Sequence, residues 1–468
     1  MSMRMAPTGL QTCSRRKTLS LGRAGWSRAV GAAIVGLLMV GAADRPAFAQ
    51  GYDWLRGLPG FGSDNDRGER RRESREKAPA EPQNDLRTGD MPLRSEAMLN
   101  AFRDTIERYS AIAQKGGWPL IPGTRAMRPG DDDERVPLAR RRLIATGDLR
   151  TAQNYDTFNY DGELEQGVRR FQERNGLRVS GRIDRATLQA MNVTVQVRIT
   201  QLQRNLQRVE ELVGQRIEDR YVLVNVPGFQ LEAVERGVVE QRHRVIAGKP
   251  ERQTPVVKAS IRALNFFPFW RVPDSVATLD LIPRLRKEPE YLQKEQIRVL
   301  RGDFNGPELD SSAINWNQAE ATRIKFRQDP GPQNALGLVR LDMPNEHGVY
   351  MHDTPMKPLF GQNSRAFSAG CVRVQEVFDL AAWIARDEPN MDRRRIETIL
   401  ETGMAVDITL ARPVPVYFAY LTAWIEPSGR VEFRPDIYGR DGLRELSGDR
   451  ERDPDAPPPP PQANNLAP

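Results

Sequence analysis

The stretch HGVYMHDTPMKPLFGQNSRAFSAGCVRV, residues 347–374, has an alternating strand pattern that ends at a histidine and, further on, a glycine followed by a cysteine. The chain has two cysteines. Cys13 lies in an N-terminal segment that we interpret as an export signal, so Cys371 is the only cysteine expected in the exported protein. An odd cysteine in an exported protein is an intermolecular disulfide partner, a buried small hydrophobe or a reactive thiol.

The reactive-thiol interpretation requires a base beside the sulfur, because the thiolate is the nucleophilic form of cysteine. His347 and His352 precede Cys371 in the same stretch. In a strand with a period of two, Tyr350 and His352 share a face, whereas His347 and His352 face opposite ways. Cys371 follows Gly370 and is expected to open a helix, whose N-terminus favours a thiolate and offers backbone N–H groups to an oxyanion. The spacing favours a His352–Cys371 pair and leaves open a buried cysteine beside a hydrogen-bonded histidine.

Two arginines flank the cysteine, Arg365 and Arg373. A guanidinium can hold a substrate carboxylate with two parallel hydrogen bonds. A surface arginine paired with a nearby acid is the alternative, and it fits Arg365 better than Arg373. One cysteine and scattered histidines make no metal-ligand set, so we expect no metal and no cofactor.

Residues 1–49 have the order of a secretory signal peptide. Basic residues precede an apolar run over 29–43, and Ala47 and Ala49 occupy the small-residue positions of a cleavage site. The run is short and contains glycines, which favours removal over retention as a membrane anchor. The sequence SRRKTLS also resembles a twin-arginine signal, so the export route stays open. Seven basic residues and one acid lie in this segment, so it holds most of the formal net charge of +7, and nucleic-acid binding loses its main support.

Helical patterns dominate the first half of the remaining chain. Residues 50–92 are rich in Gly, Pro and charge and are predicted to be a disordered linker. Apolar residues at helical spacing from 93 predict a helix that ends at Gly116-Gly117. The segments VRRFQERNGL and GRIDRATLQAMN, the second with Asp184 as its N-cap, and the pattern over 197–212 predict a small three-helix module.

Strand patterns dominate from residue 220. Val- and Ile-rich alternation predicts antiparallel strands, and a helical pattern follows Cys371. Residues 274–334 interrupt the strands with a charged, helix-like stretch and a long loop. The proline-rich tail 445–468 is predicted to be disordered.

The opening stretch resembles the active-site signature of the L,D-transpeptidases with a YkuD-type catalytic domain, a histidine followed later by Ser/Thr-x-Gly-Cys-apolar-Asn/Arg. The residues that fall on this pattern are His352, Ser368, Gly370, Cys371, Val372 and Arg373. NFFPFWRVPDS, FRQDPGPQNALGLVR and VPVYFAYLTAW are similar to segments of the large periplasmic branch of the family. Many members have a second histidine where this chain has Ala369, which leaves His352 as the base.

The resemblance implies a fold of the α+β class, a mainly antiparallel β catalytic domain with a helical capping insertion, preceded by helices. The implied domains are a signal peptide (1–49), a disordered linker (50–92), N-terminal scaffold helices (93–150), a peptidoglycan-binding-like helical module (151–215), the L,D-transpeptidase catalytic domain (216–444, with the capping insertion at about 274–334) and a disordered tail (445–468).

The resemblance also implies roles for the residues of the signature. Cys371 is the nucleophile and His352 the general base and acid. The Asp353 backbone carbonyl fixes the histidine tautomer, and backbone N–H groups at Gly370 and Cys371 hold the oxyanion. The residues implied to bind substrate are Tyr350, Ser368 and Arg373.

The implied activity is formation of 3→3 peptidoglycan cross-links through a cysteine thioester, with release of D-alanine. The partners are a tetrapeptide stem as donor, a diamino-acid side chain as acceptor and other cell-wall synthesis proteins, and the expected state is a monomer in the periplasm of a Gram-negative-type bacterium. Carbapenem acylation of Cys371 is expected by the same resemblance. The alternatives are an L,D-carboxypeptidase or D-amino-acid exchange enzyme, a non-catalytic peptidoglycan-binding scaffold and an ordinary cysteine peptidase.

Overall fold

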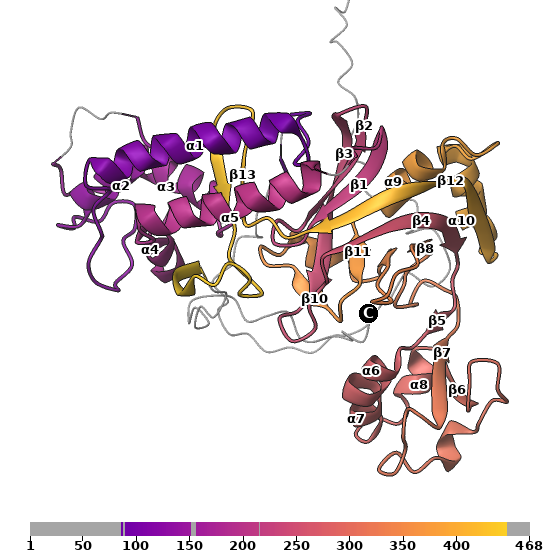
Figure 1. Ribbon diagram of the computed structural model, residues 1–468. Helices are drawn as coiled ribbons and strands as arrows, with labels where there is room; N and C mark the ends of the chain where they lie inside the picture. The colour runs from indigo at the N-terminus through magenta and orange to yellow at the C-terminus, as the bar shows by residue number, and fades with distance from the viewer. Residues whose placement is uncertain (1–85, 88, 151–155, 215, 447–468) are drawn as a thin grey trace, which may run out of the picture. The chain divides into compact units, whose positions relative to one another are not determined.

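The computed structural model describes residues 86–87, 89–150, 156–214 and 216–446, and Figure 1 shows their helices and strands. The predicted signal peptide lies outside the described residues, as do most of the predicted linker and most of the predicted tail. Within the described ranges, no helix is long and apolar enough to cross a bilayer. Helices come first along the chain and strands dominate the second half, which confirms the α+β class.

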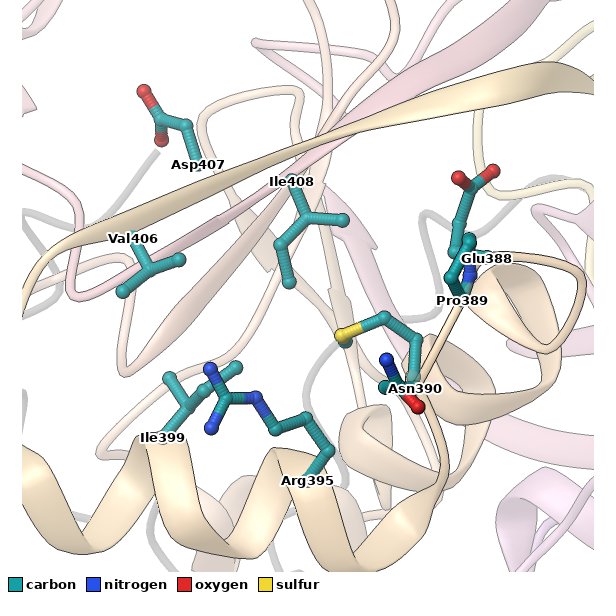
Figure 2. A pocket seen from close by; sticks show the side chains of 9 residues that line it. Glu388, Pro389, Asn390, Arg395, Ile399, Val406, Asp407 and Ile408 are labelled. Atoms are coloured by element: carbon teal, nitrogen blue, oxygen red, sulfur yellow. The ribbon is translucent and has the colours of Figure 1, made fainter.

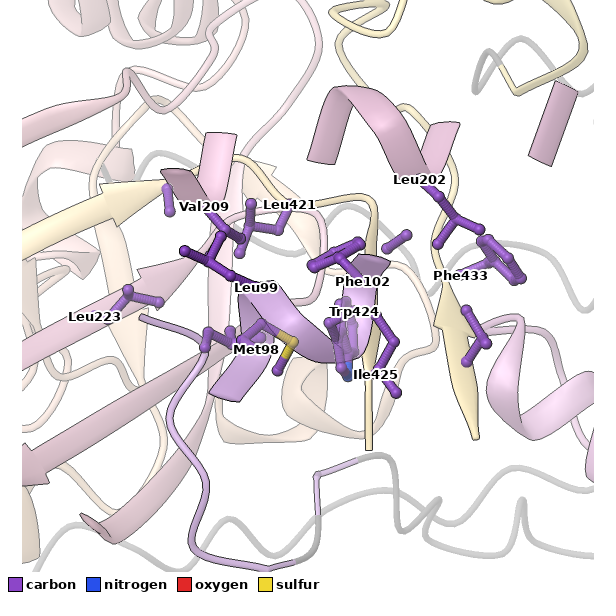
Figure 3. Packing of buried hydrophobic residues seen from close by; sticks show 14 of the residues in the cluster. Met98, Leu99, Phe102, Leu202, Val209, Leu223, Leu421, Trp424, Ile425 and Phe433 are labelled. Carbon is purple, nitrogen blue, oxygen red and sulfur yellow. The ribbon is translucent and has the colours of Figure 1, made fainter. Parts of the chain in front are cut away.

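Five helices open the described chain: α1 (Glu96–Gln114), α2 (Val136–Ala145), α3 (Gly162–Arg174), α4 (Arg185–Met191) and α5 (Val195–Val213). The predicted helical spacing after residue 93 is confirmed by α1, which begins where the Ser95 side chain accepts a hydrogen bond from the Met98 N–H. The apolar face of α1 packs on α5 and on β13 (Ala423–Ile425). Figure 3 shows Phe102 of α1 beside Trp424 of β13 in this core, where both side chains are fully buried. The C-terminal part of the chain therefore completes the core of the N-terminal helices.

Helices α2, α3 and α4 share a second apolar core around Val168 and Phe171. The predicted N-cap of α4 is present, because the Asp184 side chain accepts a hydrogen bond from the Thr187 N–H at 2.8 Å. Phe171 is fully buried, with the guanidinium groups of Arg142 and Arg174 over its ring. It therefore offers no exposed aromatic surface to a glycan.

Most strands belong to one nine-stranded sheet with the order β10-β3-β11-β9-β8-β4-β12-β1-β2. The bounds are β1 (Arg220–Asn225), β2 (Gln230–Glu235), β3 (Val238–Gly248), β4 (Val257–Phe266), β8 (Val339–Asp342), β9 (Met351–His352), β10 (Ala366–Ser368), β11 (Val372–Val374) and β12 (Val406–Ala419). Because β2 pairs with β3 as well as with β1, the sheet closes into a ring of hydrogen-bonded strands. Most pairs are antiparallel, as predicted; β1–β12, β9–β11 and β3–β10 are parallel. Two helices, α9 (Val377–Ala385) and α10 (Arg393–Thr402), lie between β11 and β12 in sequence.

The predicted insertion forms a subdomain with its own core, which we call the capping subdomain. Its elements are β5 (Trp270–Arg271), α6 (Asp274–Val276), η2 (Ala277–Leu281), α7 (Ile282–Leu285), α8 (Tyr291–Lys294), β6 (Ile297–Arg301) and β7 (Ile324–Gln328). The expected helix-like stretch is present, but the expectation of a long loop after it was wrong. The helical part is divided into short turns, and two segments of the expected loop, IRVLR and IKFRQ, pair with each other and with β5 in a three-stranded sheet.

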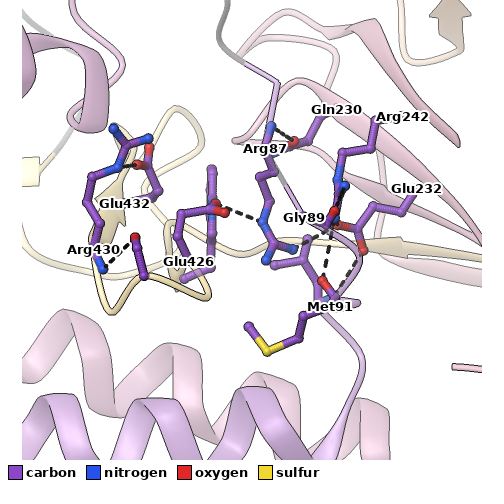
Figure 4. Close-up of polar contacts among 12 residues, drawn as sticks. Arg87, Gly89, Met91, Gln230, Glu232, Arg242, Glu426, Arg430 and Glu432 are labelled. Carbon is purple, nitrogen blue, oxygen red and sulfur yellow. Dashed lines mark hydrogen bonds and ion pairs between the residues drawn. The ribbon is translucent and has the colours of Figure 1, made fainter. Parts of the chain in front are cut away.

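The last residues of the predicted linker are in contact with the sheet. Arg87 is buried, and its guanidinium binds Glu232 of β2 at 2.8 Å and Glu426, just after β13, at 2.9 Å (Figure 4). Glu232 also accepts a hydrogen bond from the Leu93 N–H. The segment that contains Arg87 thus joins the sheet to the C-terminal part of the helical core, and the boundary expected at residue 92 lies too late.

Candidate active site

The candidate site lies where β9 and β11 run side by side. These strands are parallel, with Val372 opposite Met351 and Arg373 opposite His352. The Val372 N–H donates to the Tyr350 carbonyl at 3.0 Å. The same register therefore places Cys371 opposite Tyr350. Side chains alternate along each strand and register partners point to the same side. The side chains that share one face of this pair are therefore Tyr350, His352, Cys371 and Arg373.

The backbone around Cys371 differs from the expectation. The residues that follow Cys371 form β11, and α9 begins only at Val377. The sequence VRV alternates and pairs with β9 on one side and β3 on the other, which keeps the chain extended. Cys371 therefore does not lie at the N-terminus of α9, so the expected support of its thiolate by that helix end is missing.

His352 is fully buried, and a backbone carbonyl holds its ring. The His352 Nδ1 lies 2.5 Å from the Asp353 carbonyl oxygen. A carbonyl oxygen can only accept, so Nδ1 carries the proton and Nε2 is the basic nitrogen. The rings of Tyr350 and His352 meet edge to face with their centroids 5.7 Å apart, as the shared strand face requires. This arrangement fixes both the tautomer and the tilt of the imidazole.

The Asp353 side chain supports the same turn. Its carboxylate is almost fully buried, accepts a hydrogen bond from the Leu338 N–H at 3.0 Å and pairs with the Lys357 ammonium group. The turn after β9 is thus tied to the loop before β8. The backbone carbonyl that binds His352 therefore belongs to Asp353, whose side chain is itself fixed by Leu338 and Lys357.

Cys371 is buried, with 7% of its surface exposed. Burial raises the pKa of its thiol to about 11, and hydrogen bonds from Tyr350 and the positive charges of Arg373 and Arg340 act in the opposite direction. Burial also raises the pKa of the Tyr350 hydroxyl well above its usual value. Both groups are therefore protonated at neutral pH when the site is empty, and a base must remove the thiol proton during reaction.

Arg340 is a site residue that the sequence interpretation missed. It stands opposite His352 in the antiparallel register of β8 and β9, and its guanidinium lies 5.5 Å from the centroid of the Tyr350 ring. Its Nε donates to Asn265 Oδ1 at 3.0 Å, and its side chain is about one third exposed. The alternation in GLVRLDM gives its face, but only the β8–β9 register brings it next to the histidine.

The two flanking arginines lie in places that the sequence did not predict. Arg373 has no exposed surface, and burial lowers the pKa of its guanidinium to about 10, while Cys371 acts in the opposite direction. Arg365 is also buried and donates to the carbonyl oxygens of Val245, Gln362 and Phe229. Arg365 is therefore neither a surface residue nor open to a substrate carboxylate. It ties the segment before the cysteine to β3 and to the turn before β2.

Ser368 and Gly370 shape the turn that carries the cysteine. The Ser368 hydroxyl accepts from the Gly370 N–H at 3.1 Å and donates to the Cys371 carbonyl at 2.5 Å. Ser368 has no exposed surface. The expected substrate contact of Ser368 is therefore not made from this conformation, and the Gly370 N–H, expected to hold an oxyanion, is occupied by the serine.

The capping subdomain packs against the site. Tyr350 and Ala369 are both partly buried against its apolar core, which includes Trp270 and Leu336. A second linkage joins Arg252, in the loop between β3 and β4, to Asp280 of η2, with Arg252 Nη2 2.6 Å from Asp280 Oδ1. The capping subdomain is therefore held both by apolar contacts with Tyr350 and Ala369 and by an ion pair with the β3–β4 loop.

One cavity of about 560 Å³ lies elsewhere, between the α9–α10 turn, α10 and the start of β12. Figure 2 shows Arg395, Ile399 and Ile408 facing into it. None of the residues predicted from the sequence to act in catalysis lines it. It is therefore separate from the candidate site.

Comparison with known proteins finds similarity over two parts of the chain. Residues 219–408 match the YkuD family, described as "L,D-transpeptidase catalytic domain", and residues 132–191 match "Putative peptidoglycan binding domain". A curated protein of Haemophilus influenzae named "Putative L,D-transpeptidase" is 32% identical over 232 residues, which cover 49% of this chain and 46% of that protein. The chain thus matches about half the length of this relative.

Solved structures similar to this chain include an L,D-transpeptidase from Mycobacterium smegmatis, at 14% identity and a TM-score of 0.22, covering 43% of this chain and 58% of that chain. Another is an L,D-transpeptidase from Stackebrandtia nassauensis, at 14% identity and a TM-score of 0.24, covering 64% of this chain and 96% of that chain.

Proposed function

We propose that the chain cross-links peptidoglycan stem peptides through a thioester on Cys371, because residues 219–408 match an L,D-transpeptidase catalytic domain and residues 132–191 match a putative peptidoglycan-binding domain. The donor is a tetrapeptide stem that ends in D-alanine. The acceptor is the side-chain amine of the diamino acid at position three of another stem. The product is a 3→3 cross-link, and D-alanine is released.

The observation that carries this proposal is the common face of β9 and β11. It brings the only cysteine of the described residues to the same face as a buried histidine whose Nδ1 is bound to a backbone carbonyl. A nucleophile, a base and a group that orients the base are the components of covalent acyl transfer. A peptidoglycan-binding scaffold requires none of them.

The first half of the reaction forms the acyl-enzyme. His352 Nε2 accepts the Cys371 proton as the sulfur attacks the carbonyl carbon of the bond before D-alanine. The carbonyl oxygen becomes an oxyanion, which we assign to the Cys371 N–H, since the Gly370 N–H is bound to Ser368. The imidazolium then gives its proton to the leaving nitrogen, so that D-alanine departs as a neutral amine and the thioester remains.

The second half transfers the acyl group. The acceptor amine attacks the thioester carbonyl, His352 removes the proton from the attacking nitrogen, and the sulfur leaves and is reprotonated. Water in place of the amine gives L,D-carboxypeptidation, and a D-amino acid gives exchange. The capping subdomain packed on Tyr350 and Ala369 supports the amine, because a covered acyl-enzyme is less open to water.

The arginines have separate roles in this proposal. Arg373 is buried, so we assign it to stabilising negative charge that develops on Cys371 rather than to gripping a carboxylate. Arg340 is partly exposed beside Tyr350 and pairs with Asp342 at 3.1 Å; it is the cation we assign to a substrate carboxylate, which would share the guanidinium with Asp342. Tyr350 lines the donor site.

The two domain matches also support a cell-wall location, in the periplasm or outside the cell. Peptidoglycan is the proposed substrate for both domains, and other cell-wall synthesis proteins are the proposed partners. Donor stems with a terminal D-alanine require a carboxypeptidase that shortens longer stems.

The test is intact-mass spectrometry of the protein incubated with a carbapenem. We expect a single covalent adduct on the wild type, no adduct on Cys371→Ala and slow formation on His352→Ala. Chromatography of stem-peptide products should then show 3→3 dimers. A folded wild type that forms no adduct would contradict the acyl-enzyme and favour the binding scaffold; an adduct without dimers would favour hydrolysis or exchange.

A further inference from the structure

The loop between β3 and β4 folds back against the turn that carries Cys371. At the end of β3, the Lys249 N–H donates to the Ser368 carbonyl at 3.0 Å. The chain then turns so tightly that a Cβ on Gly248 would lie 2.1 Å from the Arg252 carbonyl oxygen and 2.7 Å from the Thr254 nitrogen. Only glycine allows this approach. The turn brings Thr254 next to Gly370.

Thr254 connects the two turns through its hydroxyl. The side chain is fully buried, accepts a hydrogen bond from the Gly248 N–H at 2.8 Å and donates to the Gly370 carbonyl oxygen at 2.8 Å. The direction is fixed, because an N–H can only donate and the hydroxyl has a single hydrogen. The carbonyl oxygen of the peptide between Gly370 and Cys371 is therefore bound to a fixed donor.

This bond sets the direction of the Cys371 N–H. A trans peptide is planar and its C=O and N–H groups point in opposite directions, so holding the Gly370 oxygen also holds the Cys371 hydrogen. Ser368 binds the same turn through the Gly370 N–H and the Cys371 carbonyl. Gly370 has a φ of +126°, a conformation open to glycine, and without these bonds the peptide has freedom to rotate.

We propose that Thr254 is a positioning residue that orients the Cys371 N–H toward the oxyanion of the acyl-transfer intermediate. The inference rests on the proposed function, since it assigns a part of that chemistry. Its hydroxyl touches neither substrate nor sulfur and acts only through the peptide. A preorganised donor is effective because it needs no reorientation when the charge develops.

A purely structural role for Thr254 predicts different behaviour. Its backbone also belongs to the fold, because the Thr254 N–H donates to the Tyr438 hydroxyl at 3.2 Å, and that hydroxyl donates to the Gly248 carbonyl at 2.5 Å. Loss of stability alone would reduce carbapenem acylation in proportion to the folded fraction, but it would speed alkylation, because unfolding exposes the Cys371 thiol and removes the burial that raises its pKa. Loss of orientation would affect only reactions that form an oxyanion.

The experiment compares two reactions of Cys371 in the folded full-length protein. Carbapenem acylation passes through an oxyanion, whereas alkylation by iodoacetamide displaces iodide and forms none. In Thr254→Val we expect acylation to slow by about 10- to 100-fold, less than the roughly 100- to 1,000-fold for deleting a donor outright. Alkylation forms no oxyanion and depends on the thiolate, so its rate at Cys371, followed by peptide mass, should change by less than about twofold.

Two further variants complete the test. Thr254→Ser keeps the hydroxyl and should restore acylation to near the wild-type rate. Thr187→Val removes a buried threonine hydroxyl from α4, where it accepts from Gln172, and should leave both reactions unchanged. If Thr254→Val is too unstable to purify, Thr254→Ala replaces it under the same criterion.

The proposal is overturned if the alkylation rate changes together with the acylation rate in Thr254→Val, if acylation is unchanged, or if Thr254→Ser is as slow as the valine variant. Failure of the proposed function looks different, because wild-type protein would then form no carbapenem adduct at all. Each outcome therefore refers to one of the two proposals.

Discussion

Cys371 should titrate far above neutral pH in the absence of substrate. Burial raises the pKa of its thiol from 9.0 to about 11. A shift of this size corresponds to roughly 2.7 kcal/mol against the thiolate, at about 1.36 kcal/mol for each pKa unit. At pH 7 the thiolate is then about one part in 10,000, against about one part in 100 for an unperturbed thiol of this reference value. The resting site should hold a thiol beside a histidine rather than a preformed ion pair.

The assay is the pH dependence of alkylation by iodoacetamide, which reacts with the thiolate. The rate at Cys371 should rise about tenfold with each pH unit from roughly pH 7 to pH 10 and show no plateau in that interval. Arg340→Met removes one of the positive charges that oppose the burial effect, so its inflection should move to still higher pH. The same rates measured on a cysteine-containing peptide give the unperturbed reference.

His352→Ala separates the resting state from the reaction. If the resting pair is neutral, alkylation near pH 10 should be nearly unchanged in this variant, while carbapenem acylation at pH 7 should fall by about 100-fold or more, the usual contribution of a general base. A wild-type plateau below about pH 8 that disappears in His352→Ala would refute this reasoning, because it would reveal a thiolate–imidazolium pair.

Three further predictions concern other parts of the molecule. Asp280→Asn removes the carboxylate partner of Arg252 and should loosen the capping subdomain, so that the carbapenem adduct hydrolyses a few-fold faster by intact mass; an unchanged adduct lifetime would mean that this pair does not hold the subdomain closed. Arg87→Met removes the cation that two buried carboxylates share, which leaves Glu426 unpaired and Glu232 with Arg242 alone among the described residues, and it should lower the free energy of unfolding by about 3–5 kcal/mol in urea titration, whereas Arg103→Met, at an exposed pair, should change it by less than about 1 kcal/mol. Burial lowers the pKa of His243 from 6.5 to about 4, so the unfolded chain takes up a proton first as the pH falls. The free energy of unfolding should therefore fall by about 3 kcal/mol between pH 6.5 and pH 4, and His243→Gln should flatten this dependence.

The alternating pattern within residues 347–374 correctly predicted which side chains of one strand lie on the same face. A period of two placed Tyr350 and His352 on one face, and the structure confirms that their rings are in contact. The tautomer-fixing carbonyl of Asp353, implied by the family resemblance, lies where that role requires. Both features involve residues close to one another in sequence, so a short segment is enough to predict them.

Features that depend on partners distant in sequence were predicted poorly. Cys371 was expected at a helix start, but pairing with β9 and β3 keeps the following residues in a strand. Arg340 and Thr254 reach the site only through the register of β8 and the fold of the β3–β4 loop. The burial of Arg365 likewise depends on carbonyl oxygens more than one hundred residues earlier in the chain. Contacts between residues so far apart in sequence cannot be predicted from the periodicity of a short segment.

The closed ring of strands also determines when the chain can become stable. Strand β12 lies between β4 and β1, so the ring has a gap until residues 406–419 are present. The same late part of the chain supplies Trp424 to the core of the N-terminal helices. Pairing across such long separations in sequence makes folding slow, because a large loop must close before the contacts that stabilise it can form. An incomplete chain therefore lacks its cooperative core and should stay unfolded while it emerges from the ribosome.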